Sequence, residues 1–107
     1  MLEMHVTGPG EARLLADGSP IGSARWEMRS LSWPGERVQV ARVTALQVPQ
    51  DYRADFWAYL TFLFQRGGAA AARLDGVWFW FSQALQKSWE EAGRPEEVAP
   101  LDGGQSI

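Results

Sequence analysis

The sequence predicts an α+β domain in which an antiparallel meander leads into a strand-helix-strand-helix unit. Three observations indicate this class. The first third of the chain is divided by turn clusters and has no helical pattern. An apolar strand pattern then precedes a helical pattern over residues 52–66, and a very aromatic run precedes a second helical pattern ending at Ala92. Because a strand-helix-strand order implies a crossover between parallel strands, the sheet is expected to be mixed.

The N-terminal meander is predicted from alternating strand and turn signals. Strands are expected over residues 1–7, 12–16 and 21–28. The turns between them are Gly8-Pro9-Gly10 and the hairpin signal Asp17-Gly18, and Trp33-Pro34-Gly35 is a third turn. The chain then enters an apolar strand over 38–48, whose two pleat faces both carry apolar residues, as in a strand that is covered on both sides.

The first helix is expected over 52–66, with Asp51 as its N-cap and Gly67 or Gly68 at its end. Its apolar stripe follows helical spacing and predicts packing on a sheet. The stripe consists of Phe56, Tyr59, Leu60, Leu63 and Phe64. Trp57 and Phe62 lie off this stripe, so the helix is expected to contact something on a second side.

The aromatic run over residues 77–81 is predicted as the second strand of the unit, parallel to 38–48. Ser82 is expected to cap a helix that runs through Ala92 and is closed by Gly93. Residues 96–101 predict a last short strand. The single domain is thus expected to span 1–101, followed by a flexible tail over 102–107.

Composition excludes several classes of function. The chain has no cysteine and a single histidine, His5, so neither a metal site nor thiol chemistry is expected, and no cofactor is predicted. With 10 basic and 13 acidic residues and no basic cluster, direct nucleic-acid binding is not expected. No apolar run is long enough to cross a membrane. Six tryptophans in 107 residues exceed what a small core holds, which favours a protein interface.

Several segments resemble the GNAT (Gcn5-related N-acetyltransferase) fold, N-terminally trimmed and degenerate. They are LLADGSPIGSARW over residues 14–26, ARVTALQVPQDYR over 41–53, and the helix Ser82-x-x-Leu85-x-x-x-Trp89-Glu90-x-x-Gly93. The last is similar in spacing to the family's Asn-x-x-Ala-x-x-x-Tyr-Glu-x-x-Gly helix. A weaker likeness is to acetyltransferase-like virion proteins of short-tailed phages.

The resemblance implies an acyl-CoA site near Val48, Arg53 and Ala58, but the signature residues depart from the family. Phe56 replaces a glycine of the pyrophosphate turn, Asp55 adds a negative charge there, and Trp89 replaces the tyrosine acid. These departures predict that acetyl transfer is lost.

The two helices that normally separate the family's first strands have no room between Thr7 and Ala12. We therefore expect an uncovered aromatic sheet face that a protein partner or a second copy covers. The residues assigned to this interface are Trp26, Trp33, Trp57, Phe62, Trp78 and Trp80.

The first functional hypothesis is thus a catalytically inactive GNAT-like module in protein-protein assembly or binding, such as a phage structural or accessory protein. It would be cytoplasmic, since the N-terminal residues lack a signal-peptide pattern, or virion-associated if of phage origin. One alternative is an active acyl-CoA-dependent N-acyltransferase with an atypical CoA-binding turn, which would bind acetyl-CoA. The other is a small phage-type inhibitor of a host protein.

Overall fold

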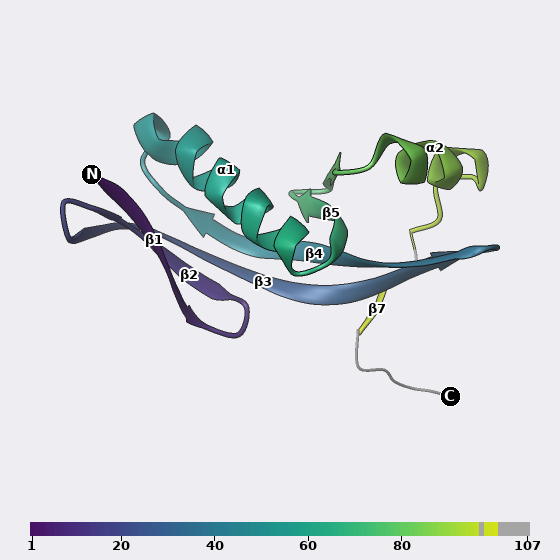
Figure 1. Ribbon diagram of the computed structural model, residues 1–107, viewed down its shortest axis with the longest axis horizontal. Helices are drawn as coiled ribbons and strands as arrows, with labels where there is room; N and C mark the ends of the chain where they lie inside the picture. The colour runs from purple at the N-terminus through teal and green to yellow at the C-terminus, as the bar shows by residue number, and fades with distance from the viewer. Residues whose placement is uncertain (97, 101–107) are drawn as a thin grey trace.

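The computed structural model describes residues 1–96 and 98–100 and shows the predicted α+β class (Figure 1). The described strands form one seven-stranded mixed sheet, in which β1-β2-β3-β4-β5-β6 lie in this order and β7 pairs with β3. The elements are β1 (Leu2–Gly8), β2 (Glu11–Ala16), β3 (Ser19–Trp33), β4 (Glu36–Gln47), α1 (Gln50–Arg66), β5 (Ala69–Leu74), β6 (Val77–Trp80), α2 (Gln83–Glu91) and β7 (Val98–Pro100). The predicted tail, residues 102–107, lies outside the described residues.

The predicted antiparallel meander is confirmed over β1 to β4. Its turns fall at the predicted positions, and both Asp17 and Gly18 have positive φ, as the tight hairpin turn requires. The strand predicted over 21–28 is longer, because β3 continues to Trp33. The first half of β3 pairs with β2, and its second half pairs with β7.

The predicted position of the parallel strand is wrong. The strand parallel to β4 is β5, and the aromatic strand β6 returns antiparallel to β5 through the Asp75-Gly76 turn. The Ala69–Ala72 run has low strand propensity, but its alanines are buried or half-buried in the sheet, where small side chains let layers on both faces approach closely. Burial therefore outweighed propensity in this segment.

The two helices begin differently from one another. Pro49, and not Asp51, is the N-cap of α1, which has no side-chain cap, so the predicted Asp51 cap is wrong. Asp51 instead lies in the first turn, where a carboxylate interacts favourably with the helix dipole. The predicted cap of α2 is confirmed, because Ser82 Oγ accepts a hydrogen bond from the Leu85 N–H at 3.2 Å.

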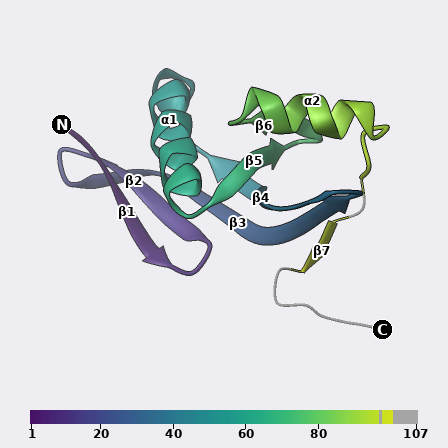
Figure 2. The ribbon, with the colours of Figure 1, turned by 45° about the vertical axis from the view of Figure 1, so that its right-hand side comes forward.

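Apolar clusters occupy the two faces of the sheet. On the face covered by α1, Phe56, Leu60 and Phe64 pack on strand residues such as Leu14 and Ala41. On the opposite face, Trp89 of α2 packs with Leu31, Trp33, Val40 and Ala71, beside Trp78 and Trp80. The two faces follow from the register, since Met28 pairs with Ala41 whereas Leu31 pairs with Val38. We call them the α1 face and the α2 face; the helices lie over different ends of the sheet (Figures 1 and 2).

The expected uncovered aromatic face is wrong for the described residues. Its aromatic portion, around Trp78 and Trp80, is packed against α2 of the same chain. Elsewhere the α2 face carries charged side chains, including the ion pairs Arg25–Glu11 at 3.5 Å and Arg29–Glu27 at 3.6 Å. Side chains alternate between the two faces along β3. The residues Arg25, Glu27 and Arg29 therefore point to the α2 face, whereas the apolar residues between them point to α1.

Candidate functional site

The most exposed cluster of large apolar side chains lies where α1 borders the edge strand β1. Phe62 is 61% exposed, Val6 is 54% exposed and Tyr59 is 37% exposed. Together with the half-buried Leu2 and Met4 they form what we call the α1–β1 patch. Leu2, Met4, Tyr59 and Phe62 line a hollow of about 490 Å³, to which Glu3 and His5 also contribute.

The local sequence explains why these residues gather. Leu2, Met4 and Val6 alternate along β1 and pair with Ala16, Leu14 and Ala12, so they share the α1 face. Tyr59 and Phe62 are three residues apart on α1 and therefore lie side by side on its surface. Because β1 is the first strand in the sheet order, its outer edge pairs with no other strand of residues 1–96 and 98–100.

Few ionisable side chains lie near the α1–β1 patch, and one of them is the cation Arg66. The Arg66 guanidinium lies 5.5 Å from the centre of the Phe62 ring, which is a cation–π distance. Glu3 and His5 alternate with the patch residues on β1, and the His5 Nε2 atom lies 3.7 Å from a Glu3 carboxylate oxygen. The patch is thus an apolar surface with charged groups at its rim.

The structure separates the residues that the sequence assigned to a partner interface. Trp33 is buried, and its indole N–H donates to Ser88 Oγ at 2.9 Å. Trp26 packs edge-on against Phe64, and Trp78 stacks on Trp80. Among these six assigned residues, Phe62 alone has a largely exposed side chain, and the five tryptophans are buried or half-buried.

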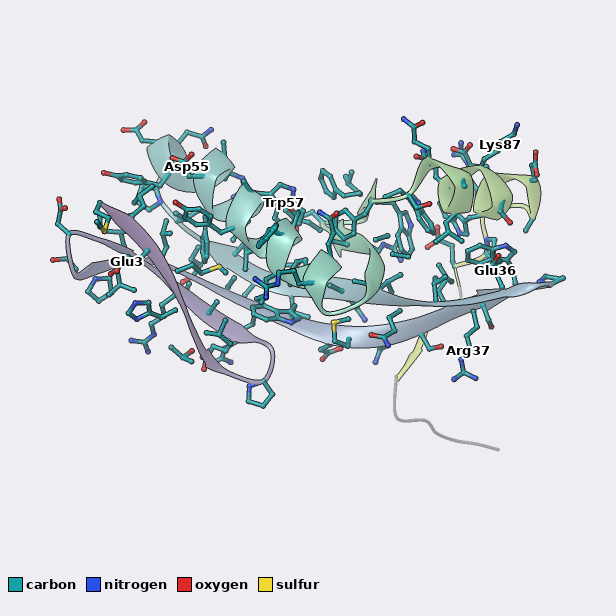
Figure 3. All side chains as sticks on the ribbon, in the orientation of Figure 1. Glu3, Glu36, Arg37, Asp55, Trp57 and Lys87 are labelled. Carbon is teal, nitrogen blue, oxygen red and sulfur yellow. The ribbon has the colours of Figure 1, made fainter. Side chains whose placement is uncertain are left out.

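Trp57 marks a second, smaller apolar area on the other side of α1. Its ring centre lies 5.0 Å from that of Phe79 on β6, and Phe79 and Val77 are 36% and 54% exposed. Figure 3 shows Trp57 on α1, and Asp55 nearer the start of the same helix. The contact explains why Trp57 lies off the helical stripe, because it packs on β6 within the same chain.

Sequence reasoning missed the β1 half of the patch. Met4 and Val6 alternate with polar residues in a pattern that indicates a strand with one apolar face. That pattern was the available signal, but it does not say whether the face is covered. Tyr59 was assigned to the buried stripe, and the structure places it at the surface.

The residues that the resemblance assigns to an acyl-CoA site do not converge. Val48 lines a hollow of about 450 Å³ with Arg13, Ser23 and Gln47, but neither Arg53 nor Ala58 lines it. Residues 53–58 all lie inside α1, beyond its first turn. Their amides are therefore engaged in the helix and are not free to bind a pyrophosphate.

Trp89 occupies the position that matches the tyrosine acid of the family, and the structure shows its side chain buried in the core. The side chain is 5% exposed, and its indole N–H donates to the Pro95 carbonyl at 2.9 Å. Its ring packs against those of Trp78 and Trp80. An N–H group committed in this way cannot protonate a leaving group.

Two further features bear on the chemistry of the described residues. Within residues 1–96 and 98–100, no group of three or more His, Cys, Asp or Glu side chains is placed to hold a metal ion. In the same part of the chain, neither helix has the length and apolar character that a membrane span needs.

Comparison of the chain with protein-family models, curated proteins and solved structures yields no match. The GNAT-like relationship therefore stays a prediction, and the functional argument depends on the geometry above.

Proposed function

We propose that the protein is a GNAT-like module without acetyl transfer activity that binds another protein chain through the α1–β1 patch. The observation that carries this proposal is the exposure of Phe62 and Tyr59 at a hollow that Leu2 and Met4 also line, with Val6 exposed further along the same face of β1. Exposed apolar clusters rimmed by polar groups are typical of protein interaction sites.

The patch has the composition of an interface centre. Aromatic side chains are enriched at energetic hot spots, and a Phe or Tyr that enters a partner's pocket gives large contact area at low entropic cost. Full burial of one such side chain contributes roughly 1.5–3 kcal/mol. Phe62, with the largest exposed fraction of the patch residues, is therefore the expected anchor.

The loss of acetyl transfer is supported by the two observations on the family positions. The amides of residues 53–58 lie within α1, and the Trp89 N–H is engaged by Pro95. We infer a role in protein-protein assembly or binding, for which a phage structural or accessory protein is the first candidate. A phage-type inhibitor of a host protein would use the same patch, so the identity of the captured partner distinguishes the two.

A site-specific photo-crosslinker at residue 62 tests the proposal in the native cell. The expected result is one defined adduct, either with a second copy of the chain or with one partner protein. The matched control places the same crosslinker at Lys87 on the exposed side of α2, where no adduct is expected.

Two substitutions of equally exposed valines make the test specific. Val6 and Val77 are both 54% exposed, but Val6 belongs to the patch and Val77 lies on β6. Val6→Ser is expected to reduce the adduct at residue 62 strongly, whereas Val77→Ser leaves it unchanged. Equal effects of the two substitutions, or no adduct at residue 62, would refute docking at the patch.

Calorimetry with acetyl-CoA tests the second half of the proposal. Arg53→Gln is expected to leave any heat of acetyl-CoA binding unchanged, because residues 53–58 offer no free amide cradle. Micromolar binding that Arg53→Gln abolishes would instead support the acyltransferase alternative.

A further inference from the structure

We propose that the α2 face carries a binding site for a small phosphate-bearing molecule, built from Arg29, Arg42 and Arg73 with Trp78 as one wall. These residues line a hollow of about 470 Å³, together with Val40, Val43, Thr44, Asp75 and Glu96. A hollow of this volume falls within the range of small-molecule sites.

The sheet register brings the three arginines together. Arg42 on β4 pairs directly with Arg73 on β5, so the two side chains leave the sheet on the same face from adjacent strands. Arg29 on β3 pairs with Val40, two residues from Arg42, and therefore also projects from this face. Like charges directly opposite one another destabilise a sheet, and a bound anion between them removes that repulsion.

Three carboxylates lie near the three arginines: Asp75 and Glu96 line the hollow, and Glu27 is the strand partner of Arg42. Glu96 lies 2.9 Å from Arg73, and Glu27 lies 3.6 Å from Arg29. Among the described residues, no ion pair engages Arg42, which is exposed. The hollow thus presents one guanidinium to solvent and two more beside it, in a chain whose net charge is −3.

The hydrogen-bond donors that a ligand in the hollow could reach are the terminal guanidinium N–H groups of the arginines. The Arg29 Nε and Trp78 Nε1 atoms have no hydrogen-bond acceptor among the described residues, but both are buried and do not face the hollow. A guanidinium binds phosphate oxygens with two parallel N–H groups.

The remaining surface of the hollow sets the shape of the ligand. The Trp78 ring stacks on Trp80 at 5.7 Å and lies 5.0 Å from the Arg73 guanidinium, so it is held in place. Trp78 and Val40 provide an apolar wall beside the arginines. We infer a phosphate group between Arg42 and Arg73, with a small organic remainder against Trp78.

This site is independent of the proposed partner surface. The arginines lie on the α2 face, whereas the α1–β1 patch lies on the α1 face of the sheet. Loss of one is therefore not expected to remove the other, and the crosslinking experiment above does not depend on the ligand.

Titration calorimetry with inorganic phosphate, pyrophosphate and ADP at constant ionic strength tests the proposal. Saturable binding of at least one probe is expected, and Arg42→Gln should weaken it about tenfold or more. Arg66→Gln is the matched control, because it removes the same charge on α1, where Arg66 lies over Phe62. Stronger binding of ADP than of pyrophosphate would show that the organic part of the ligand contributes to binding. Stronger binding of pyrophosphate would show that the phosphate groups dominate. Either result supports the site.

The Glu96→Gln variant tests the same site, and here ligand binding is expected to become stronger instead of weaker. Because Glu96 competes for Arg73, its neutralisation should strengthen binding several-fold. The circular dichroism spectrum of each variant checks that the chain still folds. No saturable binding of any probe at millimolar concentration, or equal weakening by Arg42→Gln and Arg66→Gln, overturns the proposal.

Discussion

Replacement of Trp89 tests how α2 is attached to the sheet. Trp89 is the buried residue of α2, and its ring centre lies 5.4 Å from that of Trp78 and 5.2 Å from that of Trp80. Trp89→Ala removes these contacts and the hydrogen bond to Pro95, and it leaves a cavity between α2 and the sheet. The expected cost is about 3–5 kcal/mol of unfolding free energy.

A cost of this size is a large part of the stability of a small domain. At roughly 4 °C or more per kcal/mol, the melting temperature should fall by more than about 10 °C. Trp89→Phe keeps an aromatic ring but removes the indole N–H, so its expected cost is about 1–2 kcal/mol. The difference between the two variants measures the packing contribution of one aromatic ring at this position.

Urea unfolding followed by far-UV circular dichroism measures both costs, because tryptophan fluorescence would change with the substitution itself. Phe62→Ala serves as the control and should change stability by less than about 0.5 kcal/mol, because Phe62 is 61% exposed. If Trp89→Ala costs less than about 1.5 kcal/mol, Trp89 does not anchor α2, and the α2 face is less well covered than we conclude.

Other predictions concern the core, a turn and a helix cap, all measured by urea unfolding. Phe56→Ala, at a fully buried position under α1, should cost about 3–5 kcal/mol, and a cost near that of Phe62→Ala would contradict the assigned helix orientation. Gly10→Ala should cost clearly more than Gly18→Ala: both glycines have positive φ, but the added Cβ lies within contact of the Trp26 carbonyl at Gly10 and in open space at Gly18. Equal costs would show that the Gly10 turn relaxes. Ser82→Ala should cost about 1 kcal/mol through loss of the cap, and hydrogen exchange of the Leu85 amide should accelerate; unchanged exchange would argue against the cap.

Four of the six tryptophans lie together in the α2-face cluster, so their main role is packing within the chain. Their number suggested a partner interface, but Trp33, Trp78, Trp80 and Trp89 mainly contact one another. The short helix α2 needs this cluster, because nine residues provide little apolar surface of their own. The chain therefore uses tryptophan to attach a small helix, and the candidate partner surface consists of other residues.

The sequence by itself determined the features that depend on near neighbours. The Asp17-Gly18 hairpin, the Ser82 cap and the inward positions of Phe56, Leu60 and Phe64 follow from local conformational preference and helical spacing. The α+β class followed from the order of these elements.

Only the tertiary structure decided which strands pair and which apolar faces stay open. β5 is a strand because its alanines fit between layers on the two faces, and no local signal reports that fit. Arg42 and Arg73 are 31 positions apart by their numbers, and the crossover through α1 makes them neighbours. Likewise, Trp78 is half-buried because α2 packs beside it, whereas Phe62 on α1 stays 61% exposed, and long-range packing of this kind cannot be calculated from residue spacing.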